Sequence, residues 1–298
     1  MKIKLEYIIL AVLVIAVSLY LLLRERDRMQ YKLPTLETIS SEDISRIVIK
    51  RKAEGVELVR SGDIWEILPD SHRADAQKVR DILNTIQTLS IADLVSVSKT
   101  YDRYELDNES RIEVTAFQED TVVRRFYIGS SARSSRHTYI IIPDDARVFR
   151  ARGDLRSTFD RDREDLRDKL VLSFDSSIIA EIEIKRDRGS LRLIRTAGVD
   201  DAQEDTIWKT PAGEVWDKEK VDNLLQRLSN LRCTRYLSQE ADPSQALARV
   251  VLKGDKTYRL DIFNKSGSEY PGVSSETDSV FLLSSYIVEE IINLADSN

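Results

Sequence analysis

The sequence predicts an α+β protein in which an N-terminal transmembrane helix precedes two tandem homologous domains, each an antiparallel sheet with helices packed on it. The first observation is a pattern of short strands that the chain contains twice with the same internal spacing, at Ile47–Arg60 and at Ile182–Arg195. In both copies a tryptophan and then an aspartate follow, and the inserted polar residues Gly198–Asp205 lengthen the second copy. The second observation is an uncharged run that precedes both copies.

Composition sets the class of protein. The chain has 298 residues, 42% of them hydrophobic, which is enough for two ordinary domains with real cores. Its 45 basic and 51 acidic residues give a net charge of −6, which argues against a nucleic-acid partner. A single cysteine, Cys233, excludes an internal disulfide, and with only two histidines, His72 and His137, we expect no metal centre and no cofactor.

Residues 7–23 form the predicted transmembrane anchor, after a short segment at 1–6 and before a juxtamembrane spacer at 24–42. At about 1.5 Å per residue the run spans roughly 25 Å, close to the thickness of a bilayer core. A cleaved signal peptide is the alternative, but the run is too long and no small-residue cleavage site follows it. Basic residues flank both ends, so charge alone leaves the orientation open.

The first repeat, residues 43–172, is expected to open with three strands at Ile47–Arg51, Val56–Arg60 and Ile64–Ile67. A helix should begin after Asp75, whose carboxylate can cap its free amides. Five aliphatic residues then recur at helical spacing and predict one buried stripe. They are Val79, Ile82, Leu83, Ile86 and Leu89.

The second repeat, residues 173–298, has the same stripe after Asp217. Its members are Val221, Leu224, Leu225, Leu228 and Leu231.

Each repeat continues with a hairpin, a polar loop, a last strand and a terminal helix. The hairpins are expected at Arg111–Thr115 with Val122–Tyr127, and at Arg249–Leu252 with Tyr258–Phe263. The last strands, Tyr139–Ile142 and Val280–Leu283, are predicted to correspond to each other. The terminal helices should lie near Asp145–Phe159 and Ser284–Leu294, with the charged Asp160–Lys169 as a link between the repeats.

Two short motifs resemble those of penicillin-binding enzymes: Ser96 with Lys99, and Lys265-Ser266-Gly267. That chemistry needs the serine at the start of a buried helix, whereas Ser96 comes after one. We therefore expect a chance match and predict no catalytic residue.

Five other features have ordinary structural interpretations. The loops Gly129–His137 and Lys265–Ser279 are of opposite charge and are expected to be solvated hairpin tips. Arg161–Asp165 alternates in sign, as an exposed helix or linker does. An acidic group lacks the order of a calcium loop; it comprises Asp200, Asp201, Glu204 and Asp205. Trp65 and Trp208 recur at matching positions and are expected in the core, as is Cys233.

The layout resembles the domain-of-unknown-function family 4340. The resemblance is carried by the anchor, by the Ile-x-Ile-Lys-Arg strand at Ile47–Arg51, by Trp65 before Pro69, by the helix start at Ala74-Asp75 and by Tyr104–Asp107. It covers nearly the whole chain and implies an accessory subunit of a gliding-motility-type ABC transporter. The family has no established catalytic residues, so none is carried over.

The resemblance implies a non-enzymatic, single-pass protein of the cytoplasmic membrane with an extracytoplasmic domain. Its expected partners are the transporter permease, other auxiliary subunits and the lipid around residues 7–23. One alternative is a cell-envelope module that binds glycan or lipid, which would need an exposed aromatic row or an apolar groove. A serine hydrolase built on Ser96 is the third alternative.

Overall fold

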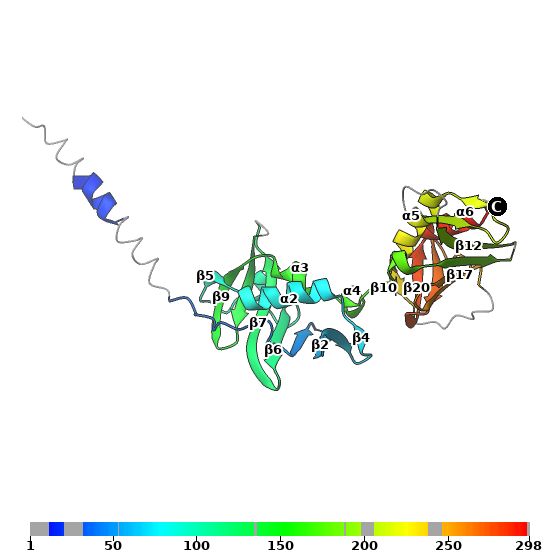
Figure 1. Ribbon diagram of the computed structural model, residues 1–298. Coiled ribbons are helices and arrows are strands. Elements are labelled where there is room, and N and C mark those ends of the chain that lie inside the picture. Colours follow the sequence, from blue (N-terminus) through cyan, green and yellow to red (C-terminus); the bar gives the residue numbers. More distant parts are fainter. Residues whose placement is uncertain are drawn as a thin grey trace, which may run out of the picture. The chain divides into compact units, whose positions relative to one another are not determined.

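The computed structural model describes residues 12–20, 32–52, 54–133, 136–187, 189–197, 206–237 and 246–296. The chain divides into two compact units (Figure 1), unit 1 ending at Arg167 and unit 2 beginning at Asp168. Each unit contains a nine-stranded sheet, and every pair of neighbouring strands is antiparallel. The α+β class is therefore confirmed.

The sheet of unit 1 has the strand order β4-β3-β2-β1-β6-β7-β8-β9-β5. The strands are β1 Arg46–Lys50, β2 Gly55–Ser61, β3 Ile64–Leu68, β4 His72–Arg73, β5 Ile91–Ser96, β6 Ile112–Gln118, β7 Thr121–Ser131, β8 His137–Ile142 and β9 Asp145–Arg152. The helices are α2 Ala76–Thr88, α3 Leu155–Phe159, α4 Arg163–Leu166 and the short 3-10 helix η1 Asp102–Tyr104.

The sheet of unit 2 has the order β14-β13-β12-β11-β17-β18-β19-β20-β16. Its strands are β11 Glu181–Arg186, β12 Gly189–Ala197, β13 Thr206–Lys209, β14 Val215–Trp216, β16 Arg235–Tyr236, β17 Ala248–Lys253, β18 Thr257–Ile262, β19 Glu269–Ser274 and β20 Thr277–Ser284. A two-stranded sheet pairs β10 Leu170–Ser173 with β15 Asn230–Arg232. The helices are α5 Lys218–Leu228, α6 Ser285–Asp296 and the 3-10 helix η2 Ser176–Ile178.

Strand by strand, the two sheets have the same order, and β11 takes the place of β1. The register agrees as well: Ile49 lies between Val56 and Val114, just as Ile184 lies between Leu191 and Val250. The predicted strands and hairpins of both repeats are present at these positions. Most bounds agree within two residues, but β7 extends four residues past Tyr127 and β20 begins three residues before Val280.

The central helix of each unit begins where the sequence predicts. The carboxylate of Asp75 accepts hydrogen bonds from the amides of Gln77 at 2.9 Å and Lys78 at 3.2 Å. Asp217 caps α5 in the same way. The aliphatic stripe of each helix is buried against its sheet, and α2 runs across unit 1 in Figure 1. The last predicted member of each stripe is buried but not helical, because Leu89 follows α2 and Leu231 lies in β15. Burial of each such side chain contributes about 1.5–3 kcal/mol.

The helix predicted near Asp145–Phe159 is wrong for most of its length, because β9 occupies Asp145–Arg152 and only Leu155–Phe159 is helical. Val148 belongs to a small core on one face of the sheet, whereas Phe149 and Ala151 belong to the main core on the other. A strand covered on both faces has no simple alternation to reveal it. The terminal helix predicted at Ser284–Leu294 is confirmed as α6.

The predicted match between Tyr139–Ile142 and Val280–Leu283 is also wrong. β8 corresponds by strand order to β19, and β20 corresponds to β9. The sequence hides β19 because it lies within the Ser/Gly-rich Lys265–Ser279 and contains Pro271-Gly272, which are typical of a loop.

Among the described residues no helix is long and apolar enough to cross a membrane. Residues 12–20 are helical, and the rest of the predicted anchor, 7–11 and 21–23, lies outside the described residues.

Gly129 is buried in β7, although the sequence predicts a solvated hairpin tip there. A Cβ atom at this position would lie 2.1 Å from the carbonyl oxygen of Tyr104 and 2.7 Å from Cγ of Leu106. The segment around η1 can therefore approach the sheet closely only because residue 129 has no side chain. The hydroxyl of Ser130 donates to the same Tyr104 carbonyl at 3.2 Å.

We expect Gly129→Ala to destabilise unit 1 by about 1–3 kcal/mol, the usual cost of forcing an extra carbon into a packed site. Gly189→Ala is the matched control, because a Cβ there meets nothing within 4 Å and should leave stability nearly unchanged. Urea unfolding of both variants measures the difference. Equal effects of the two substitutions would contradict the close-approach explanation.

Candidate functional site

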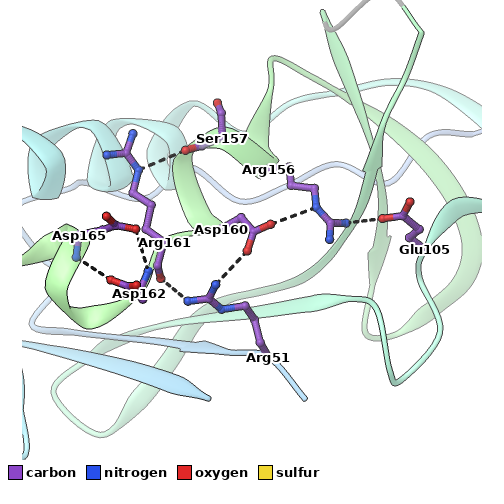
Figure 2. A network of polar contacts seen from close by, with 8 residues as sticks. All are labelled: Arg51, Glu105, Arg156, Ser157, Asp160, Arg161, Asp162 and Asp165. Atoms are coloured by element: carbon purple, nitrogen blue, oxygen red, sulfur yellow. Dashed lines mark hydrogen bonds and ion pairs between the residues drawn. The ribbon is translucent and has the colours of Figure 1, made fainter. Parts of the chain in front are cut away.

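The arginine that ends the repeated Lys-Arg strand motif is the centre of a polar network in unit 1. Arg51 follows β1, and its Nη1 lies 2.9 Å from Oδ1 of Asp160, the residue that ends α3. Its Nη2 donates to the carbonyl of Arg161. Figure 2 shows the guanidinium of Arg51 between these two acceptors. A positive charge at the end of a helix also suits the helix dipole.

Arg156 extends the network to the family-like segment Tyr104–Asp107. Its Nη1 donates to Oε2 of Glu105 at 2.8 Å, and its Nε lies 3.3 Å from Oδ2 of Asp160 (Figure 2). Glu105 has a positive φ of 53°, an unusual backbone for this residue, directly after η1. The network therefore joins the end of β1, the end of α3 and the η1 segment.

The charge run Arg161–Asp165 is partly the exposed helix that the sequence predicts. Asp162 caps α4, and its carboxylate and that of Asp165 form a reciprocal capping box. The segment is more than a solvated link, however. Arg163 donates to the carbonyl of Gly55 at 3.2 Å, and the fully buried Leu166 accepts from the amide of Asp75 at 2.8 Å.

The Lys-Arg motif of unit 2 also attaches the first strand to the terminal helix. Arg186 ends β11, and its Nη1 binds Oδ1 of Asp296, the last residue of α6. In both units an arginine thus ties the end of the first strand to the end of the terminal helix, and the repeated Lys-Arg pattern serves the fold.

The second repeated arginine packs on the repeated tryptophan. The guanidinium carbon of Arg60 lies 5.3 Å from the ring centre of Trp65, and that of Arg195 lies 5.2 Å from the ring centre of Trp208. Trp65 is 8% exposed and Trp208 is fully buried, so both are core residues, as predicted. Nε1 of Trp208 donates to Oδ1 of Asp222 at 3.1 Å.

The residues of the hydrolase alternative do not have the geometry that such chemistry needs. Ser96 ends strand β5 instead of starting a helix, and its hydroxyl lies 2.8 Å from that of Ser98. Lys99 is exposed in unit 1, whereas Lys265 belongs to unit 2, where its Nζ lies 5.5 Å from the ring centre of Tyr270.

The other residues singled out in the sequence have structural environments. Cys233 is buried, as expected. Burial and the nearby Arg167 lower the pKa of His72. Asp200, Asp201, Glu204 and Asp205 lie outside the described residues. Within the described ranges, no group of three or more His, Cys, Asp or Glu side chains is arranged to hold a metal ion.

The sequence analysis did not predict a tyrosine cluster that lies on the face of the unit 1 sheet opposite the main core. The rings of Tyr104 and Tyr139 are 4.8 Å apart at 55°, and Tyr101 and Tyr127 pack with them around the buried Leu106. All four tyrosines are partly buried. These aromatic side chains contact their own domain and form no exposed row for a sugar. The signal that could have found them is the Tyr104–Asp107 motif itself.

Two open grooves lie on the surface of the described residues. The first, of about 430 Å³, lies beside the Arg51 network between Glu54–Val56 and Asp162–Glu164. The second, of about 440 Å³, lies between α5 and α6. Its lining includes Lys220, Asn223, Tyr286, Glu289 and Asn293.

Tyr286 is the most exposed large hydrophobic side chain described in α6, at 62%. Its ring centre lies 4.9 Å from the guanidinium carbon of Arg227, whose Nε is also 3.3 Å from Oε2 of Glu290. The aromatic ring is therefore held on the rim of the groove by a neighbouring cation.

Comparison with known proteins gives one match. The model of the family "Domain of unknown function (DUF4340)" matches residues 73–249, more than half of the chain. The chain belongs to the DUF4340 family. The match runs from β4 in unit 1 to β17 in unit 2, so the DUF4340 region takes in parts of both sheets. No curated protein and no solved structure matches the chain.

Asp222 gives unit 2 of this DUF4340 chain a defined pH dependence. Burial by itself would raise the pKa of Asp222, but hydrogen bonds from Lys218 and Trp208 more than offset it, and the net pKa lies below the ordinary value. A carboxyl whose pKa is lower in the folded state stabilises the fold above its unfolded pKa. That contribution is lost as the pH falls through the folded pKa.

We expect Asp222→Asn to cost about 1 kcal/mol or less at pH 7, because the side chain is partly exposed, and to flatten the loss of stability in acid. Denaturant unfolding at pH 7 and pH 3, followed by tryptophan fluorescence, measures both effects. Glu289→Gln, an exposed groove residue, is the control. An unchanged acid limb in Asp222→Asn would contradict the assignment.

Proposed function

We propose that the chain is a non-enzymatic, membrane-anchored accessory subunit of an ABC-2 or gliding-type transport complex. In this proposal residues 7–23 cross the cytoplasmic membrane once, and the two sheet units lie on the extracytoplasmic side. Their partners are the permease and other auxiliary subunits. Gene duplication of one sheet unit produced the two repeats, which the identical strand order supports.

The observation that carries the proposal is the use of the repeated polar residues. In both units the motif arginines contact carbonyls, carboxylates and tryptophan rings of their own unit. The duplicated element is therefore a scaffold, and its exposed surfaces are available for partner contacts. Membership of the DUF4340 family is compatible with this role but does not specify it.

The helix at residues 12–20 supports the anchor. Its valine, leucine and isoleucine side chains are more than 45% exposed, as for Ile15 at 65% and Val17 at 48%, and such side chains suit lipid.

We expect the full-length chain to stay in the membrane pellet after an alkaline carbonate wash, and Ile15→Lys to shift part of it to the supernatant. A lysine near the middle of a span costs roughly 2.5–3.5 kcal/mol on insertion scales. Val215→Lys, at an exposed valine of unit 2, should not change the distribution. Release of the unaltered chain by the wash would refute the anchor.

The test of the transport role is purification of the tagged, full-length protein from its native membrane in mild detergent. Mass spectrometry should identify a permease and other transporter subunits in the eluate. A preparation without any transporter subunit would remove the proposal's main support.

The α5–α6 groove is the surface that we assign to the transporter subunit. Tyrosine and arginine are, together with tryptophan, the residues that are enriched at interface hot spots. The mixed rim of lysine, glutamate and asparagine can satisfy the polar groups of a polypeptide.

We therefore expect Tyr286→Ala to reduce the recovered transporter subunits at least about tenfold, as loss of a hot spot does. Val215→Ala is the matched control, since Val215 is 61% exposed and lies in the same unit but outside the groove lining. Equal recovery with the two variants would show that the groove is not the contact surface. The transport role would then still be tested by the purification of the unaltered protein.

A further inference from the structure

The residues just before β1 are fastened to unit 1, although the sequence predicts a spacer there up to residue 42. Leu36 and Ile39 pack against the main core of the unit, and Ile44 is fully buried. Arg60 donates to the carbonyl of Glu42 at 2.8 Å and to that of Ser41 at 3.2 Å. We call residues 36–45 the strap.

Arg124 of β7 joins the strap to the central helix. Its side chain is buried; Nη1 donates to the carbonyl of Ile86 at 2.9 Å and Nη2 donates to the carbonyl of Glu37. Ile86 lies in the last turn of α2, where carbonyls have no partner within the helix. Burial lowers the pKa of Arg124, with the negative charge of Glu37 opposing the shift. One guanidinium thus binds the incoming chain and the end of α2 together.

Unit 2 holds its incoming chain by a different means. β10 pairs through its backbone with β15, which comes directly after α5. The strand register places Tyr258 where Arg124 stands in unit 1, because Tyr258 lies opposite Leu252 as Arg124 lies opposite Ala116. The ring of Tyr258 packs at 5.1 Å from that of Phe174. The incoming chain of unit 2 is therefore held by a backbone ladder and a ring contact.

We propose that the strap is a releasable latch, closed by Arg124, that transmits displacement of the preceding residues 24–35 to helix α2. Side-chain contacts hold the strap from Leu36 to Ile44, and its last residue, Ser45, pairs through its backbone with Phe117 and Arg60. Backbone pairing of β10 holds the counterpart in unit 2, so the strap before Ser45 opens before the sheet does. Opening returns the guanidinium to water and frees the end of α2. The inference rests on the proposed anchor only for the origin of the displacement.

Glutamyl endopeptidase tests the latch directly, because the bond it cuts after Glu37 contains the carbonyl that Arg124 binds. The full-length chain is digested in detergent, and mass spectrometry measures the rates of cleavage after Glu37 and after the exposed Glu214, which lies between β13 and β14 of unit 2. Cleavage tracks the open population when opening is fast. We expect cleavage after Glu37 to be slow in the unaltered chain and at least about tenfold faster in Arg124→Met, as loss of a charged hydrogen bond implies.

Arg125→Met is the matched control: Arg125 is the next residue of β7, is exposed, and lies 3.8 Å from Glu113. It should leave cleavage after Glu37 slow, and Glu214 should be cut at the same rate in every variant. Leu36→Ser should increase the rate of cleavage after Glu37 while Arg124 is kept. This second variant tests the latch if Arg124→Met fails to fold. Two results would overturn the latch: cleavage after Glu37 as fast as cleavage after Glu214 in the unaltered chain, or Arg124→Met and Leu36→Ser both behaving like Arg125→Met. Because the digestion contains no partner, its outcome is independent of the transporter purification.

Discussion

The contact on which both units depend is the burial of one aliphatic helix stripe against the inner face of a sheet. Val79, Ile82 and Ile86 of α2 are nearly inaccessible, as are Val221, Leu224 and Leu228 of α5. At about 1.5–3 kcal/mol per buried side chain, this stripe supplies more than any single polar contact in the same unit. The aspartate caps mark where each helix begins, and the helical spacing of the aliphatic residues decides which face meets the sheet.

Arginine side chains then attach the surrounding segments to this helix-on-sheet core. Arg51 and Arg186 bind the ends of the terminal helices, while Arg60 and Arg124 bind carbonyls of the incoming chain. The guanidinium suits this task because it carries several donors in a fixed fork and keeps its charge when buried. The arginines that recur in both copies are thus used inside their own units, where they support the fold.

Local sequence patterns predicted helices and strands correctly where one face of the element is buried and the other is exposed to solvent. The stripes of α2 and α5 and the alternation of Ile47 with Ile49 are of this kind. Sequence patterns failed to predict strands that are covered on both faces, such as β9, and strands that contain Pro and Gly, such as β19. The Arg51 network and the Arg124 bridge join residues far apart in the chain, so no window of sequence contains them. The Arg51 network had one indication in the sequence, the Lys-Arg pair that occurs in both copies. Arg124 had no such indication, because the second repeat has Tyr258 at the equivalent position.

Comparison of the two units distinguishes contacts that the fold requires from contacts that can serve a function. Contacts that occur in both units, such as the arginine on the tryptophan and the arginine at the last helix, are requirements of the scaffold. Contacts that occur in one unit are free to differ because the scaffold stands without them. Such differences are the buried Arg124 in the place of Tyr258, the longer α6 that borders a groove, and the tyrosine cluster under η1. In the accessory subunit that we propose, function would lie in these unshared features: unit 1 would receive the chain from the membrane, and unit 2 would present a surface to a partner.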